Sequence, residues 1–261
     1  MTIFKHELRR GKVSFIIWTA AITFFLVICV FMFPEMKDQM QSVSDMFASM
    51  GSFTAAFGMD RLNFGEFMGF YGVECGNILG IGGALFAALL GVSALSKEEK
   101  EHTAEFLLTH PVSRARIITG KLCAVFAQII LMNAIIFICV VLSAAAIGEK
   151  PDWSTLMLLH LAYFILQIEI SAVCFEISAF LRRGGVGAGL GLAALMYFLN
   201  ITANISESAG FLKYITPFGY TESADIVEAN SLDGVLVGIG LSVTVLGIAA
   251  AYTKYCKKDI Q

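Results

Sequence analysis

Charged side chains are scarce in this sequence. Asp, Glu, Lys and Arg make up 15% of the 261 residues, whereas hydrophobic residues make up 57%. About a quarter of the residues in a soluble globular chain are charged, so this chain has too few polar groups to cover a surface that faces water. We therefore expect most of its surface to face lipid, and the composition excludes a soluble globular protein.

The sequence also lacks the motifs of common catalytic and metal-binding sites. It contains no HExxH, no GxSxG and no CxxC, and it has no Walker A pattern, GxxxxGK followed by Ser or Thr, with which a chain binds ATP phosphates. The histidines are not grouped at the spacing of metal ligands. All cysteines but Cys256 lie in or beside apolar segments, where a free cysteine behaves as a small hydrophobe. We expect no catalytic residue, no metal and no ATP site on this chain.

Six apolar segments are long enough to cross a bilayer, whose core of about 30 Å needs about 20 apolar residues in a helix. They cover residues 13–33, 71–95, 117–147, 154–181, 184–203 and 232–253. The first is longer than the about 7–15 apolar residues of a signal peptide, so we interpret it as a retained helix. The sequence predicts a single all-α membrane domain over residues 1–261 with six transmembrane helices.

Basic residues predict the orientation of these helices. If both termini are cytoplasmic, all Lys and Arg residues fall on the inner side except Lys37, Arg61, Lys150 and Lys213. Inner loops of membrane proteins carry such an excess, so we expect both termini inside and a multi-pass protein of the cell (cytoplasmic) membrane. The basic and apolar faces of residues 2–12 predict an amphipathic helix on the inner leaflet or, equally, a cytoplasmic extension of the first transmembrane helix.

Two outer loops are too long to be simple turns. In residues 34–70, apolar side chains recur in steps of four and three from Met36 to Met50, which predicts an amphipathic helix. It would sit at the membrane interface, which we favour, or line a substrate exit. In residues 204–231, Pro217 interrupts any helix, and short helices that dip back toward the bilayer would account for the apolar first half.

Glycines recur four residues apart inside the apolar segments. The pairs are Gly76 and Gly80, Gly185 and Gly189, Gly187 and Gly191, and Gly234 and Gly238. Small residues at this spacing let helices approach closely in lipid. The spacing fits packing within one subunit and also a seam between two protomers.

Three acidic residues lie within the apolar segments. Glu169 is near the middle of the fourth, Glu176 follows seven residues later on the same helical face, and Glu74 is near the outer end of the second. Charges at this depth are costly and mark a transport path or a buried partner. We therefore consider two interpretations: a polar stripe along a translocation path, or structural pairs. The structural partners would be Gln167, His160 or Asn133 for Glu169, and Arg182 at the inner interface for Glu176.

The loop between the second and third segments, residues 97–121, alternates in charge and then becomes partly apolar. Pro111 disfavours helix at the residue before it, and Ser113 can cap a helix that follows. The pattern predicts a short amphipathic helix parallel to the membrane, placed to transmit force from a soluble partner to two transmembrane helices. A loop that only adheres to anionic lipid is the alternative, which its acidic residues disfavour.

The same loop resembles the permease subunits of the type-2 ABC exporter family. These often show an acidic stretch, then Gly-Thr, leucines, and Pro-Val-Ser-Arg before the third transmembrane helix. The matching residues here are Glu101, Thr103, Glu105, Leu107, Leu108, Pro111, Val112, Ser113, Arg114 and Lys121, with His102 at the usual glycine position. The ending Lys-Lys-Asp-Ile (257–260) also resembles the basic tail of the family.

The resemblance implies a complex of two such protomers, identical or different, with two separate ABC ATPase subunits that bind ATP and Mg. Residues 97–110 would be the coupling helix that docks on the ATPase, and the substrate would leave outward between the protomers. Relatives export drugs, peptides, lipids and ions, and nothing in this sequence selects among them. Beyond the ATPase, the second protomer and the bilayer, we expect no nucleic-acid partner.

Two other functions fit parts of the sequence. An ion-coupled secondary transporter that uses Glu169 would continue to transport without ATP and would be inactivated by Glu169→Gln. A membrane receptor or immunity subunit would bind a partner without moving a substrate.

Overall fold

The computed structural model describes residues 2–49, 51–100, 112–181 and 185–257, which form helices joined by loops and no β-strand. Six of the helical stretches are long and apolar enough to cross a membrane. They are α1 (Thr2–Ser49), the composite of α3 (Phe67–Cys75), η1 (Gly76–Ile81) and α4 (Gly82–Lys100), then α6 (Arg114–Ala146), α7 (Trp153–Phe180), α8 (Val186–Ile205) and α10 (Gly234–Lys257). The predicted all-α membrane protein with six such helices is therefore confirmed.

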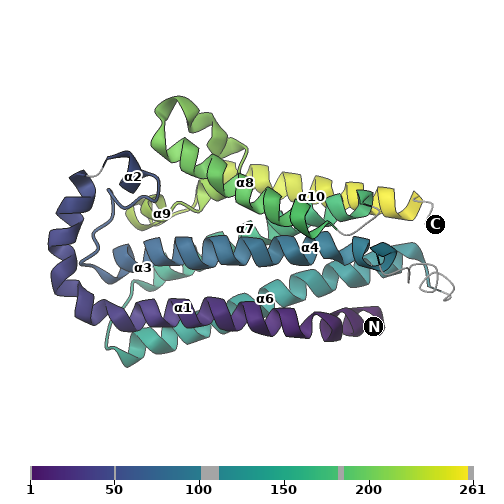
Figure 1. The fold of residues 1–261 in the computed structure, drawn as a ribbon, viewed down its shortest axis with the longest axis horizontal. Coiled ribbons are helices and arrows are strands. Elements are labelled where there is room, and N and C mark those ends of the chain that lie inside the picture. The colour runs from purple at the N-terminus through teal and green to yellow at the C-terminus, as the bar shows by residue number, and fades with distance from the viewer. Residues whose placement is uncertain (1, 50, 101–111, 182–184, 258–261) are drawn as a thin grey trace.

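Both termini lie at one end of the bundle, together with the end of α4 and the start of α6 (Figure 1). We call this end the terminal face and the opposite end the far face. The short elements of the far face are α2 (Ser52–Ala55), η2 (Glu207–Tyr214), η3 (Pro217–Tyr220) and α9 (Ser223–Ala229). That the terminal face is cytoplasmic stays a prediction from the charge distribution.

The first helix is longer than the predicted segment. α1 begins at Thr2 and is continuous with the transmembrane stretch, because a lone Gly11 costs a helix only about 1 kcal/mol. Residues 2–12 are therefore an extension of the first transmembrane helix, one of the two predicted possibilities. At its other end α1 includes Pro34, which removes a backbone hydrogen bond and favours a bend. Beyond the bundle α1 turns across the far face (Figure 1), so part of the predicted outer loop continues this helix.

α4 and α7 form the centre of the bundle. In the most apolar stretch of each span, 61% of the residues are buried in the second and fourth spans, against 22% in α1 and α8 and 17% in α10. α4 packs on α7, α6 packs on α1, and α10 packs on α7. The outer helices expose large apolar side chains such as Phe24, Phe198 and Leu246, which suits contact with lipid or with another membrane helix.

The second span changes helix type near its middle. Residues Gly76–Ile81 form a π-helix between α3 and α4, and Tyr163 of α7 packs against it. A Cβ at Gly76 would lie 2.9 Å from the Tyr163 hydroxyl, and one at Gly80 would lie 3.0 Å from its ring. This glycine pair therefore serves packing within the subunit, one of its two predicted roles.

The connection between α8 and α10 turns back along α8 (Figure 1). Thr216 caps η3 by accepting a hydrogen bond from the backbone N–H of Phe218. Its hydroxyl donates to the carbonyl oxygen of Met196 inside α8 at 2.7 Å. Pro217 occupies the first turn of η3, where its missing N–H costs nothing. As the apolar sequence suggested, short helices here return toward the bundle.

Candidate functional site

The predicted coupling loop is described only at its two ends. Six of the proposed coupling residues lie outside the described part of the chain: Glu101, Thr103, Glu105, Leu107, Leu108 and Pro111. Ser113 is the N-cap of α6, as expected, and its side chain accepts a hydrogen bond from the backbone N–H of Arg116 at 3.3 Å. Arg114 lies 3.5 Å from the carbonyl oxygens of Tyr255 and Cys256 at the end of α10, where a cation is favoured.

A buried ion pair fixes the first turns of α6. Lys121 is only 1% exposed, and its Nζ donates to Glu7 Oε1 at 2.8 Å and to the carbonyl oxygen of Ala94 at 2.9 Å. Since Glu7 belongs to α1 and Ala94 to α4, one ammonium group joins three helices beside the loop. A buried charge of this kind is tolerated only when it is paired and hydrogen-bonded.

A serine fixes the other flank of the loop. The backbone N–H groups of Leu95 and Ser96, near the end of α4, both donate to Ser178 Oγ of α7, at 2.8 and 3.0 Å. Ser96 Oγ in turn donates to the carbonyl oxygen of Val92 at 2.7 Å. We call Glu7, Ala94, Lys121, Leu95, Ser96 and Ser178 the loop-flank cluster. Through this cluster, the end of α4 is bonded to α7 and the start of α6 is bonded to α1. The loop itself connects only α4 and α6.

Sequence reasoning identified Lys121 as part of a motif but missed Glu7 and Ser178. Glu7 is 114 positions away from Lys121, and Ser178 is more than 80 positions away from its two donors. Neither spacing has a periodic signal. The only hint was that a lysine inside an apolar helix needs a partner.

The intramembrane acids Glu169 and Glu176 both face α10, each against a glycine. Glu169 is 3% exposed, and a Cβ at Gly240 would overlap both of its carboxylate oxygens. Glu176 is half-buried, and a Cβ at Gly247 would lie 3.0 Å from its Oε2. The sequence alone did not predict a role for Gly240 and Gly247, although they are seven residues apart, as Glu169 and Glu176 are.

The structural partners considered for Glu169 are occupied elsewhere. Asn133 Nδ2 donates to Gln167 Oε1 at 2.6 Å, and His160 Nε2 shares a hydrogen bond of 2.8 Å with the Tyr71 hydroxyl. Within the described ranges, the polar group that acts on the Glu169 carboxyl is the Tyr220 hydroxyl of η3. Arg182, the partner considered for Glu176, lies outside these ranges.

Glu74 does not share the α10-facing surface of the other two acids. Its carboxylate accepts a hydrogen bond from Cys29 Sγ of α1 at 3.6 Å. Glu74 therefore lies apart from the surface that Glu169 and Glu176 share, and the role of the three acids in a translocation path stays a prediction. No three His, Cys, Asp or Glu side chains in the described residues are arranged to hold a metal ion.

A cavity of about 160 Å³ lies beside Glu169, between α7, α8 and α10. Residues 213–217, held on α8 by the bond of Thr216, complete its wall. Apart from Glu169, Lys213 and Thr216, its side chains are almost entirely apolar. The apolar lining includes Ile170, Val173, Leu192, Met196, Leu236, Ile239 and Val243.

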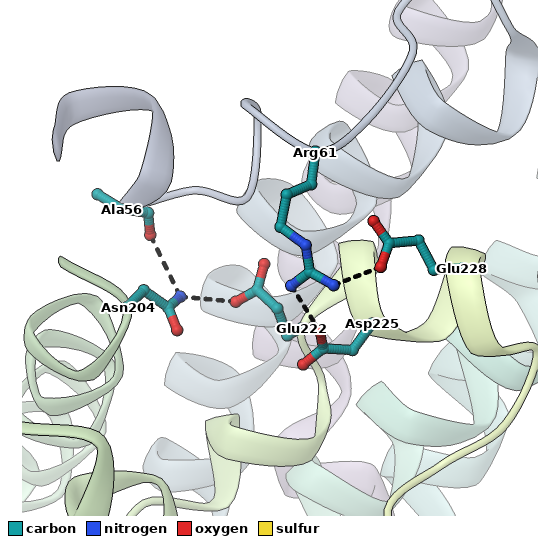
Figure 2. A network of polar contacts seen from close by, with 6 residues as sticks. All are labelled: Ala56, Arg61, Asn204, Glu222, Asp225 and Glu228. Carbon is teal, nitrogen blue, oxygen red and sulfur yellow. Dashed lines mark hydrogen bonds and ion pairs between the residues drawn. The ribbon is translucent and has the colours of Figure 1, made fainter. Parts of the chain in front are cut away.

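A polar network joins the loop after α2 to α9 and the end of α8 (Figure 2). Arg61 forms ion pairs with Asp225 at 2.6 Å and with Glu228 at 2.5 Å, and these acids raise the pKa of Arg61. Glu222 accepts a hydrogen bond from Asn204 Nδ2 at 2.7 Å. Burial raises the pKa of the Glu222 carboxyl. The sequence alone did not predict these pairs, which join residues over 160 positions apart.

The chain was compared with known proteins. A family model described as ABC-2 family transporter protein matches residues 1–260, which include all six long helices and the loop between α4 and α6. A search of curated proteins found no match.

Proposed function

Because the chain belongs to the ABC-2 transporter family, and is therefore a multi-pass membrane subunit of an ABC transporter, we propose that it serves an ATP-driven exporter. In this proposal a separate ATPase subunit hydrolyses ATP. The present chain couples that hydrolysis to the outward movement of a drug, peptide or lipid-like substrate across the cell membrane. ATP and Mg bind the ATPase.

The loop-flank cluster is the observation that supports this coupling. Residues 97–110 dock on the ATPase, and a displacement of this segment acts on the end of α4 and the start of α6 together. Ser178 passes the movement from α4 to α7, and Lys121 passes it from α6 to α1 through Glu7. Packed helices and buried hydrogen bonds move as units, so the central helices respond to a contact made outside the membrane.

Two protomers and two ATPase subunits make up the proposed complex. The apolar outward faces of α1, α8 and α10 provide surface for lipid and for a second six-helix protomer. The substrate leaves outward between the protomers. Glu169 and Glu176 on one face of α7, together with Glu74 of α3, are the acids that we place along this path.

Co-purification with an ATPase tests the proposal. We expect the ATPase encoded beside this chain to form a stable complex with it and to hydrolyse ATP in a vanadate-sensitive manner. Leu107→Asp should abolish the complex, because it introduces a charge on the apolar face of the predicted coupling helix. Phe211→Asp, which changes an exposed apolar residue on the far face, should leave the complex intact. If no ATPase binds the wild-type chain, the proposal is wrong.

Transport in proteoliposomes separates this function from the two alternatives. Export that requires ATP supports the ABC exporter. Transport that continues without ATP and is lost in Glu169→Gln would instead indicate an ion-coupled transporter. Partner binding without any flux would indicate a receptor or immunity subunit.

A further inference from the structure

Two neighbouring cavities near the far face differ in polarity. The first, of about 160 Å³, is the cavity between α7, α8 and α10, which we call the apolar cavity. The second, of about 220 Å³, lies between η2, α9 and the start of α10, and we call it the polar cavity. Lys213, Tyr214 and Leu236 line both, so the two cavities lie on either side of the same three residues.

The residues of α10 give the order of the two cavities across the bilayer. Asp233, directly before α10, lines the polar cavity. Leu236 lines both cavities, and Ile239 and Val243, further along the helix, line the apolar one. A helix rises about 15 Å from the first of these positions to the last, which is half of a bilayer core of about 30 Å. The polar cavity therefore lies at the depth of the lipid head groups, and the apolar cavity lies at the depth of the acyl chains in the same leaflet.

Exposed aromatic side chains of η2 support this depth. Phe211 and Tyr214 are 62% and 59% exposed, and the next residue, Ile215, is 56% exposed. Aromatic side chains gather where the head groups of a membrane meet its acyl chains. η2, whose Tyr214 lines both cavities, therefore lies at this boundary.

The polar cavity is lined by charges of both signs. Lys213 comes from η2, Asp225 from α9, and Asp233 from the start of α10. Within the described ranges Lys213 is partly exposed and forms no ion pair, unlike Lys37, Arg61 and Lys121. Its ammonium group is therefore available to an anionic group in the cavity.

The two acids keep one carboxylate oxygen each for a ligand. Asp225 Oδ1 accepts a hydrogen bond from Arg61, and Asp233 Oδ1 accepts hydrogen bonds from two backbone N–H groups of α10. The side chain of Asp225 is 47% exposed and Asp233 is also exposed. No described residue donates a hydrogen bond to Oδ2 of either acid, so both oxygens can accept one from a bound molecule.

This arrangement of charge favours a zwitterionic ligand. The two acids repel a molecule with a net negative charge, and Lys213 repels one with a net positive charge. A zwitterion can place its anionic group at Lys213 and its cationic group at Asp225 and Asp233. Hydrogen bonds between N–H donors and carboxylates are strengthened by charge, so a primary ammonium group fits the acids better than a quaternary one, which has no N–H.

The apolar cavity can be reached from the lipid. Ile239 and Val243 of its wall are 39% and 47% exposed, and the other residues that α8 and α10 contribute are aliphatic, methionine or glycine. An acyl chain in the bilayer can therefore lie against this wall while its head group remains at the level of η2.

We propose that the two cavities together bind one phospholipid with a phosphoethanolamine head group. Its phosphate pairs with Lys213, its ammonium group donates to Asp225 and Asp233, and the upper part of one acyl chain lies in the apolar cavity. This binding goes beyond the function proposed above and requires neither ATP nor the ATPase. Its failure would therefore leave the exporter proposal unaffected.

Native mass spectrometry of the full chain in detergent tests the proposal. The chain is titrated with phosphatidylethanolamine, phosphatidylcholine or phosphatidylglycerol, all with the same two oleoyl chains. We expect one molecule of phosphatidylethanolamine to bind with an affinity at least about fivefold higher than that of either other lipid, because phosphatidylcholine has no N–H donor and phosphatidylglycerol has no cationic group.

Two substitutions in the polar cavity change charge but little else. Lys213→Gln removes the cation, and Asp233→Asn removes one acid while asparagine still caps α10. Each should lower the affinity for phosphatidylethanolamine about fivefold, as expected for the loss of one partly exposed ion pair. Lys150→Gln and Asp60→Asn are the matched controls, because both residues are exposed near the far face and line neither cavity. They should bind this lipid as the wild type does.

A third substitution fills the apolar cavity without changing charge. Ile239→Trp enlarges a side chain of its wall and should also lower the affinity for phosphatidylethanolamine. Val245→Trp, at a position of α10 that is 66% exposed and outside the cavity, should not.

Equal affinities of the wild type for the three lipids would overturn the proposal, since only unspecific lipid at the surface would then be present. A preference for phosphatidylglycerol would also overturn it, because the site would then bind anions at Lys213 alone. So would wild-type affinity in Lys213→Gln, Asp233→Asn or Ile239→Trp. The three positions are partly or fully exposed, so if one variant does not fold, the other two still decide the outcome.

Discussion

Lys121 is a charged residue in a nearly dry environment, and its hydrogen bonds to Glu7 and to the carbonyl oxygen of Ala94 reach two different helices. It is 1% exposed and is paired with Glu7, whose side chain is 17% exposed. The loss of one member of a buried ion pair leaves a charge without compensation, whereas replacement of both members by apolar residues is often neutral. The pair therefore contributes to the specific arrangement of α1, α4 and α6 more than to net stability.

This asymmetry gives the first stability prediction. Glu7→Leu should lower the free energy of unfolding by about 3 kcal/mol, because the buried Lys121 ammonium then loses the carboxylate that compensates its charge. The double variant Glu7→Leu with Lys121→Met should recover most of that loss. Reversible unfolding in mixed micelles with increasing SDS measures both. If the loss of free energy in the double variant equals the sum of the losses in Glu7→Leu and Lys121→Met, the two side chains do not form the ion pair described here.

Glu222 gives a prediction about pH. Its side chain lies against the turn at Gly58, where an added Cβ would overlap it, and burial raises its pKa above the usual 4.5. The Asn204 hydrogen bond and the cations Lys213 and Arg61 offset this effect only in part. Because the folded pKa is raised, the contribution of this group to stability is fully present below pH 4.5 and is lost as the pH rises through the raised value.

We therefore expect the melting temperature of the wild type to fall relative to that of Glu222→Gln as the pH is raised from 4.5. Titration of one proton changes the free energy of unfolding by at most about 1.4 kcal/mol per pH unit. Glu222→Gln keeps a hydrogen-bond acceptor for Asn204 and should remove this part of the pH dependence. Asp233→Asn, an exposed acid on the same face, should leave it unchanged. An identical pH dependence in wild type and Glu222→Gln would contradict the assignment.

At the level of elements, the contact between α4 and α7 depends on close approach at Gly91. A Cβ there would overlap the carbonyl oxygen of Ser171 and lie 2.8 Å from the Cβ of Cys174. Gly91→Ala should therefore push the helices apart and cost about 1–3 kcal/mol, the usual cost of overpacking.

Gly187→Ala on α8 is the control for this substitution. No atom lies within 4 Å of an added Cβ at Gly187, so the higher helix propensity of alanine should leave stability unchanged or raise it by up to about 1 kcal/mol. SDS-induced unfolding compares the two variants with the wild type. Equal effects at both positions would mean that α4 and α7 do not pack as closely as described.

Elements were more predictable from the sequence than contacts. The length of an apolar stretch that crosses a bilayer is set by the bilayer itself, so five of the helices begin and end within a few residues of the predicted segments. The cap at Ser113 follows from local chemistry. The full length of α1 was not predicted, because the apolar run ends at residue 33 whereas the helix continues through Pro34. The contacts of Glu169 with Gly240 and of Lys121 with Glu7 depend on how helices pack in three dimensions, which periodicity along one helix does not encode.

For the whole molecule, the arrangement of charge and burial separates two kinds of surface. The central helices α4 and α7 are mostly buried, whereas α1, α8 and α10 expose their apolar faces. The terminal face holds the start of α1, the end of α4, the start of α6 and the end of α10 (Figure 1). A partner that binds at this face can therefore contact several membrane helices at once, which is what the proposed coupling requires.

The orientation of this molecule in the membrane can be tested with its own cysteines. Cys256 is exposed at the terminal face, and the excess of Lys and Arg there predicts that this face is cytoplasmic. In intact cells, a membrane-impermeant maleimide should not label Cys256, and labelling should appear once the membrane is permeabilised. Ser231→Cys, at an exposed position on the far face, should be labelled in intact cells. Peptide mass analysis identifies the modified residue, and labelling of Cys256 from outside would reverse the orientation and remove the basis for cytoplasmic coupling through the loop.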